Sequence, residues 1–193
     1  MTESKKQVVN YLKPLTHDPL VAQLQFISEH SRVPEDYLKH VGAKEFCSDA
    51  EMDWLRNAKK YLHNNDMGMV FWGPQEFSIL KKMLAIGATL VRNYIDARVY
   101  SLTELLDLLD DRNAESPECT VIIIPDFCVA DYDIPKRLIH KLSGFLTSRF
   151  IEHKGMIAYI DSYEILERKY GSTLANYVKE HHKSFSCIQE QLI

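Results

Sequence analysis

Gly68-Met69-Val70-Phe71-Trp72-Gly73-Pro74-Gln75-Glu76-Phe77-Ser78-Ile79-Leu80-Lys81-Lys82 is the stretch of sequence that decides the fold. Its apolar beginning predicts a buried strand at about 68–72, Gly73-Pro74 predicts a turn, and the following residues predict a helix. In nucleotide-binding α/β proteins such a strand and helix flank a phosphate-binding loop, G-x-x-x-x-G-K-[ST]. Counted from Gly73, the second glycine is replaced by Ser78, the lysine by Ile79 and the Ser/Thr by Leu80. The sequence therefore keeps the frame of the loop without its phosphate-binding groups.

Each replacement removes a contact that a bound triphosphate needs. A Cβ at position 78 obstructs the close approach of backbone N–H groups to the phosphates. Without the lysine no cation offsets the phosphate charge, and without the hydroxyl one magnesium ligand is missing. The remaining helix N-terminus favours an anion by only about 0.3–1 kcal/mol, and Glu76 adds a negative charge. We expect no bound cofactor and no productive ATP binding at this degenerate phosphate loop, which comprises Gly73, Pro74, Glu76, Ser78, Ile79 and Leu80.

The composition is that of a soluble globular protein of 193 residues, with 46% hydrophobic and 26% charged residues. A net charge of −4 argues against a generally basic nucleic-acid binder, although a local basic patch remains compatible with it. No signal peptide and no apolar run of about 20 residues is present, so we expect a cytoplasmic protein without membrane contact. The cysteines form no C-x-x-C pair and His181-His182 has no metal-site spacing, so we expect reduced thiols and no metal.

Predicted strands and helices alternate along most of the chain, which favours a parallel sheet with helices on both faces. Residues 1–35 are expected to form an N-terminal helical segment that packs on the domain or docks a partner, and residues 36–193 the α/β domain. Ser48-Asp49-Ala50-Glu51 and Ser101-Leu102-Thr103-Glu104 are capping boxes and predict helix starts. The five expected strands are 68–72, 98–100, 120–124, 155–160 and 184–188.

Several motifs, taken in order, resemble those of the DnaC/DnaI-type loaders of the bacterial replicative helicase and their IstB-type transposon relatives. The similarity runs from about Val33 to Leu174. The matching segments are Asn57-Ala58-Lys59-Lys60-Tyr61-Leu62, Phe71-Trp72-Gly73-Pro74, Tyr100-Ser101-Leu102-Thr103-Glu104-Leu105-Leu106, Ile124-Pro125-Asp126-Phe127 and Arg168-Lys169-Tyr170-Gly171. These loaders are AAA+ ATPases, so the resemblance implies a P-loop NTPase-like (AAA+-like) three-layer α/β/α fold with a five-stranded, mostly parallel sheet.

The departures from the family are all at groups that handle phosphate. The metal-side acid that the resemblance implies falls on Pro125, and Asp126 remains from this vestigial Walker B pair. We expect Asp126 to be a turn or cap residue rather than a catalytic base. The family's arginine that reaches a neighbouring subunit would fall on Ser172, Thr173 or Leu174. Joint loss of lysine, hydroxyl, metal acid and arginine predicts a pseudo-ATPase, not an enzyme.

Lys136, Arg137, Lys141, Arg149 and Lys154 cluster around one predicted helix. In the resembled family the corresponding region faces single-stranded DNA, so these five residues are candidate DNA contacts. A solvated helix face is an equally good interpretation.

The sequence thus predicts a non-catalytic, helicase-loader-like protein that acts in DNA replication. Its expected partner is a replicative helicase, a helicase loader or another replication protein, and a homo-oligomer is also compatible with the sequence. Two alternatives stay open. One is a divergent ATPase that binds nucleotide through Lys81 or Lys82. The other is a single-stranded DNA-binding accessory protein that uses the Lys136–Lys154 face.

Overall fold

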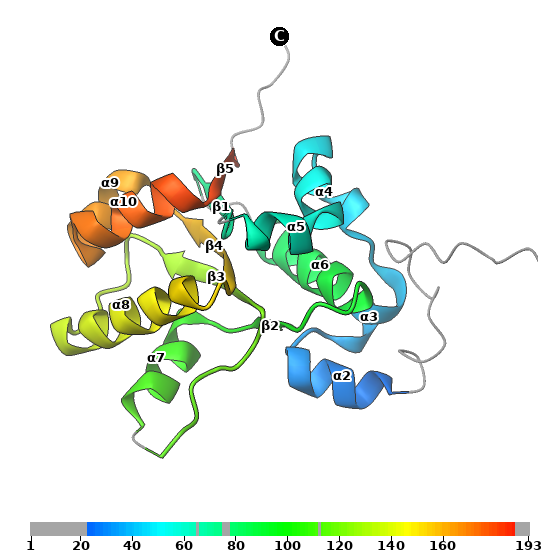
Figure 1. The fold of residues 1–193 in the computed structure, drawn as a ribbon, viewed down its shortest axis with the longest axis horizontal. Coiled ribbons are helices and arrows are strands. Elements are labelled where there is room, and N and C mark those ends of the chain that lie inside the picture. Colours follow the sequence, from blue (N-terminus) through cyan, green and yellow to red (C-terminus); the bar gives the residue numbers. More distant parts are fainter. Residues whose placement is uncertain (1–22, 65, 75–77, 112, 188–193) are drawn as a thin grey trace, which may run out of the picture.

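Five parallel strands form the central sheet of the computed structural model, which describes residues 23–187 except 65, 75–77 and 112. The strand order is β2-β3-β4-β1-β5, and Figure 1 shows helices on both sides of the sheet. The predicted parallel α/β architecture is confirmed. The strands are β1 (Gly68–Trp72), β2 (Ala97–Val99), β3 (Val121–Cys128), β4 (Gly155–Ile160) and β5 (Lys183–Ser186).

The helices divide into two groups, each with its own hydrophobic core. One group covers the face of the sheet onto which Met69, Phe71 and Ile123 project, and the other covers the face of Val70 and Ile122. The first group contains α2 (Leu24–Ser31), α3 (Glu35–His40), the 3₁₀ helix η1 (Ala43–Glu45), α4 (Asp49–Arg56), α5 (Ala58–His63) and α6 (Ser78–Arg92). The second group contains α7 (Leu102–Asp110), α8 (Lys136–Ile151), α9 (Tyr163–Tyr170) and α10 (Ser172–His181).

Gly68 sets the close approach of β1 to β4. Its φ is +151°, and a Cβ built on it would lie 1.7 Å from the carbonyl oxygen of Met156. Any side chain here would push the two strands apart, so the position requires glycine. Because β1 leads directly to the degenerate phosphate loop, this contact also fixes where the loop begins.

Both predicted capping boxes are present, with Ser48 capping α4 and Ser101 capping α7. Other expectations need correction. The helix predicted to run from the first box to Leu62 is broken at Asn57, giving α4 and α5. The strand predicted at 120–124 is β3, which continues past Ile124 with an irregular register before Cys128. Of the predicted N-terminal segment, residues 1–22 lie outside the described part, while α2 packs against α3 and β2.

Candidate functional site

The degenerate phosphate loop begins where β1 ends, at the carboxyl edge of the sheet. Gly73 has a φ of 129°, a left-handed conformation that favours glycine. The buried Tyr159 hydroxyl lies 2.6 Å from the Gly73 carbonyl oxygen and 3.0 Å from Asp161 Oδ1. Burial and the Asp161 carboxylate raise the pKa of Tyr159, so the hydroxyl keeps its proton for these acceptors. The start of the loop is thereby tied to the end of β4.

The two positions that replace lysine and Ser/Thr lie in the first turn of α6. Ile79 is 5% exposed and packs into the core, whereas Leu80 is 50% exposed. Neither side chain can pair with a phosphate or a magnesium ion. Pro74 and Ser78 are exposed, and Glu76 lies outside the described residues. The described part of the loop therefore presents an apolar side chain at the position where a triphosphate needs a hydroxyl.

Lys82 is committed to another contact. Its Nζ lies 3.0 and 3.2 Å from the two carboxylate oxygens of the buried Glu51 on α4, and 5.1 Å from the centre of the Phe71 ring. Glu51 also accepts the Ser48 N–H at 2.6 Å as part of the capping box. The ion pair joins α4 to α6 across the side of the loop, and the ammonium is no longer free to meet an anion.

A hollow of about 400 Å³ lies beside this ion pair, between α4, the start of α6 and the end of β5. Of the residues that the structure describes, its lining carries two carboxylates, Glu45 and Glu51, and one cation, Lys82. An ATP molecule brings three to four negative charges at neutral pH, so this balance of charge opposes its binding. The hollow fits a neutral or apolar group better than a triphosphate.

Asp126 caps a helix instead of facing the loop. Its Oδ1 accepts the backbone N–H of Leu102 at 2.7 Å, at the start of α7, and burial raises the pKa of its carboxyl group. The predicted role as a cap residue is confirmed. Pro125 beside it has no side-chain oxygen to bind a metal. Asp161, the polar residue that follows β4, accepts the Ala130 N–H at 2.5 Å through Oδ2.

The turn after β4 likewise serves the fold. Tyr170 donates a 2.5 Å hydrogen bond to the Phe127 carbonyl, and Lys169 Nζ donates to the Val129 and Ala130 carbonyls at 2.6 and 2.8 Å. These contacts hold α9 against the loop that follows β3. The next positions, Ser172, Thr173 and Leu174, begin α10 and carry no guanidinium group.

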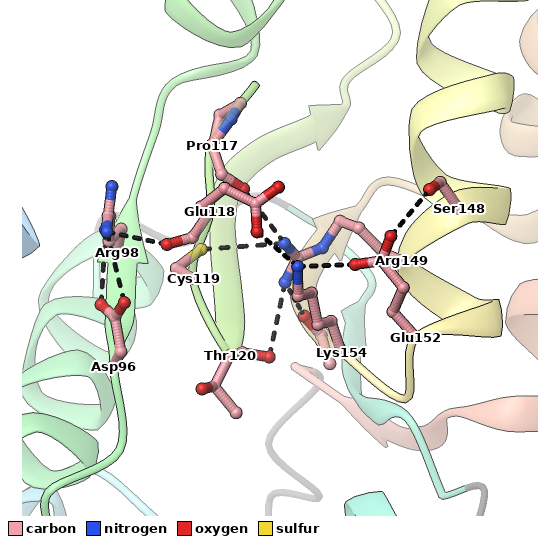
Figure 2. Close-up of polar contacts among 11 residues, drawn as sticks. Asp96, Arg98, Pro117, Glu118, Cys119, Thr120, Ser148, Arg149, Glu152 and Lys154 are labelled. Carbon is pink, nitrogen blue, oxygen red and sulfur yellow. Dashed lines mark hydrogen bonds and ion pairs between the residues drawn. The ribbon is translucent and has the colours of Figure 1, made fainter. Parts of the chain in front are cut away.

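The structure contradicts the assignment of Arg149 as a DNA contact. Its side chain is 4% exposed, and its guanidinium donates to the carbonyls of Gly155 at 2.9 Å and of Pro117 and Thr120 at 3.4 Å. Figure 2 shows this side chain reaching from α8 to the segment that enters β3. A buried arginine bonded to backbone carbonyls cannot meet a phosphate, so its role is structural.

Three of the other four candidate DNA contacts are paired with carboxylates. Arg137 and Lys141 share Oδ1 of Asp110, at 2.6 and 2.9 Å. Lys154 lies 2.6 Å from both Glu118 and Glu152 (Figure 2). Lys136 is exposed. The positive charge that the sequence suggested for this surface is therefore largely neutralised within the protein.

Three of the cysteine thiols are unreactive, and no metal centre is found among the described residues. Burial raises the pKa of Cys47 and Cys128 to about 12 and also raises that of Cys119, so these thiols stay protonated. Within the described ranges, no group of three or more His, Cys, Asp or Glu side chains is placed to hold a metal. The helices of the same ranges include none long and apolar enough to cross a membrane.

No known protein-family profile and no curated protein matches this chain in sequence. Solved structures do match its fold. A putative primosome component from Streptococcus pyogenes serotype M3 superposes with a TM-score of 0.59 at 14% identity, covering 84% of this chain and 94% of its own. The DnaC helicase loader gives 0.56 at 13% identity, covering 72% and 91%. DnaI gives 0.57 at 10% identity, covering 79% and 93%.

This chain has a fold like that of DnaC and DnaI. At such low identity the likeness establishes the fold alone, and the family resemblance suggested by the sequence is confirmed at that level. The order β5-β1-β4-β3-β2 places the degenerate loop after β1, an inner strand between β5 and β4, at the edge where the carboxyl ends of parallel strands form the binding site of such sheets.

The sequence analysis missed two features, an ion pair near this edge of the sheet and a group of cations farther from it. The Glu51–Lys82 pair joins residues 31 positions apart, and no local pattern reveals such a contact. Arg56, Lys59 and Lys60 are exposed next to one another at the α4–α5 junction. Because the helix is broken at Asn57, between Arg56 and Lys59, helical spacing could not have placed these residues together.

Proposed function

We propose that this protein is a non-catalytic, helicase-loader-like protein that acts in DNA replication by binding a protein partner. The partner is a replicative helicase, a helicase loader or another replication protein. The proposal rests on the contacts of two side chains at the phosphate loop: Ile79 packs in the core, and Lys82 forms an ion pair with Glu51. The fold, which is that of solved helicase loaders, supplies the context of replication.

The physical argument is that the loop region contributes to stability instead of to ligand binding. A nucleotide site needs donors and cations that are not already satisfied, because only they gain from the phosphates. Here the described groups around the loop bond to one another, and the adjacent hollow carries more negative than positive charge. Such a domain acts by presenting a surface, not by turnover.

A titration with magnesium-ATP tests the proposal. We expect the melting temperature of the protein to stay constant up to 5 mM ATP. A ligand with a Kd of about 50 µM would stabilise the native state by about 2.7 kcal/mol at that concentration, which for a domain of this size raises the melting temperature by about 5–11 °C. A saturable rise of that size would overturn the non-catalytic assignment.

The divergent-ATPase alternative makes a separate prediction for the same titration. If nucleotide bound through Lys82, the Lys82→Met variant would lose the ATP-dependent rise that the wild-type protein shows. We expect the two proteins to respond alike, with no rise in either. A helicase loader with an intact loop serves as the positive control for the assay.

Partner binding is tested by size-exclusion chromatography of the purified chain with the replicative helicase and, separately, the loader of the same host. Co-elution with one of them, unchanged by ATP, is the expected result. Independent elution from the helicase, the loader and the other replication proteins of the host would remove the proposed role.

A further inference from the structure

One cluster of cations stands apart from the rest of the charged surface. Arg56, Lys59 and Lys60 are exposed, and none of the ion pairs found among the described residues involves them. They line a hollow of about 420 Å³ between the α4–α5 junction and the turn after α6. In a chain of net charge −4, three neighbouring cations without acidic partners form a distinct positive surface.

A second hollow, of about 340 Å³, continues from the first. Both are lined by Tyr94 and Ile95, so they form one surface, here called the Tyr94 groove. The second part lies between α2 and the end of α6 and is lined mainly by apolar side chains. Figure 1 shows α2, α5 and α6 on the same side of the sheet, opposite the α8 surface considered above.

Two large aromatic side chains of the Tyr94 groove are exposed to solvent. Phe26 is 67% exposed and stacks on His30 at 6.0 Å, and Tyr94 is 54% exposed. Exposed aromatic side chains beside an apolar hollow mark protein interaction sites. They supply the large buried contacts that dominate binding energy.

We infer that the Tyr94 groove is the docking site for an acidic, amphipathic segment of the protein partner. The inference rests on the proposed function in that the protein acts by binding another protein. Apolar side chains of the segment enter the hollow beside Phe26 and Tyr94, and its carboxylates face Arg56, Lys59 and Lys60. Complementary charges of this kind set the orientation of the segment and speed its association.

A protein segment fits the Tyr94 groove better than a single DNA strand does. Beside its aromatic rings, its apolar part is lined by the aliphatic side chains of Ile27, Val91 and Ile95 and by Ala97, which bury apolar side chains of a protein segment but do not stack on bases. Aliphatic contacts inside a partly basic rim are the pattern of an amphipathic helix bound in a groove.

The test is a selection of displayed 16-residue peptides on the full chain, with depletion on the Arg56→Glu, Lys59→Glu, Lys60→Glu triple variant. We expect enriched peptides with net negative charge and with apolar residues at i, i+3, i+4 and i+7 spacing. Fluorescence anisotropy of labelled enriched peptides should show at least a tenfold weaker Kd with the triple variant and with Phe26→Ser. Thermal melting confirms that these variants are folded.

A matched control carries the same charge change on the opposite side of the sheet: Lys136→Glu, Arg137→Glu, Lys141→Glu. It should leave the peptide Kd within twofold of wild type. The inference is overturned if no peptide is enriched, if the enriched peptides are not acidic, or if the groove variants bind them as wild type does. If a 20-nucleotide oligo-dT displaces the bound peptide, and if the triple variant no longer binds this oligonucleotide, the groove is reassigned to nucleic acid.

The two proposals fail separately. The groove substitutions lie at the α4–α5 junction and on α2, away from the phosphate loop, so a negative peptide result leaves the ATP titration unaffected. An ATP-dependent rise in melting temperature would end the non-catalytic assignment whether or not the groove binds a peptide.

Discussion

Replacing Arg149 by methionine separates a structural arginine from a DNA contact. The substitution keeps the length of the side chain and removes the charge and its donors. The bonds lost are those to the Gly155 carbonyl at 2.9 Å and to the Pro117 and Thr120 carbonyls at 3.4 Å; Figure 2 shows the contacts with Pro117 and Thr120. Thr120 keeps a second partner, because its carbonyl also accepts the Gly155 N–H at 2.8 Å. Gly155 likewise belongs to the ladder of β4 with β3, in which it pairs with Val121, so the main loss is at Pro117.

The expected cost follows from the Pro117 carbonyl and from the weaker bonding at Gly155 and Thr120. Removing a donor from a buried acceptor costs about 1–3 kcal/mol, and methionine recovers part of it because the burial cost of the charge disappears. A net loss of about 2 kcal/mol in the free energy of unfolding is expected. For a domain of this size that lowers the melting temperature by about 4–8 °C, measurable by differential scanning fluorimetry or circular dichroism.

Two further variants make the result decisive. Arg149→Lys keeps the charge but lacks the planar fork that reaches several carbonyls, so it should melt nearly as low as Arg149→Met. Arg137→Met makes the same chemical change on the same helix at an exposed side chain, where surface ion pairs contribute little, and should melt within about 2 °C of wild type. If Arg149→Met also melts within 2 °C of wild type, the structural role assigned to Arg149 is wrong.

Four other predictions concern stability. Burial lowers the pKa of His182 to about 3, so the unfolded chain binds a proton below about pH 6.5 that the folded chain does not. Stability should fall by about 1.4 kcal/mol per pH unit from pH 6 to pH 4, and urea unfolding of His182→Phe should lack this contribution. Gly144→Ala on α8, where a Cβ meets nothing within 4 Å, should raise stability by about 0.5–1 kcal/mol, while Gly68→Ala should yield no soluble folded protein on expression. Lys82→Met should lower the free energy of unfolding by about 1–2 kcal/mol, and a double-mutant cycle with Glu51→Gln that shows no coupling would contradict the ion pair.

Much of the fold was predictable because it is written in local patterns. The strand at 68–72 and both capping boxes depend on neighbouring residues, and the structure has them as expected. Alternation of strands and helices was enough to predict parallel pairing, since parallel strands need a crossover between them. The break at Asn57 was missed because the apolar spacing of Leu55, Ala58 and Leu62 continues across it.

The candidate site was less predictable, since its contacts join distant segments. Burial of Arg149 had a readable signal: it follows Leu142 and Leu146 on the buried stripe of α8. Arg92 holds the same relation to Ala85 and Ala88 on α6. The positive charge of Arg149 suggested that its side chain lies at the surface. The position of both arginines on an apolar stripe of the helix instead directs them into the core.

Two buried arginines fasten long helices to the backbone of this chain. Arg92, near the end of α6, donates to the carbonyls of Tyr37 and Val41 at 2.9 and 2.8 Å, beside the end of α3. Arg149, near the end of α8, does the same for the segments that enter β3 and β4. Each fastens the far end of a long helix to backbone on its own side of the sheet.

The ion pair of Lys82 with Glu51 holds the N-terminal end of α6 against α4. The helix that follows the phosphate loop is thus held at both ends by side chains of this chain. In an ATP-binding protein the phosphates would hold its N-terminus. A domain fastened internally in this way keeps one conformation whether or not ATP is present. It therefore suits a protein whose effect depends on a constant surface such as the Tyr94 groove.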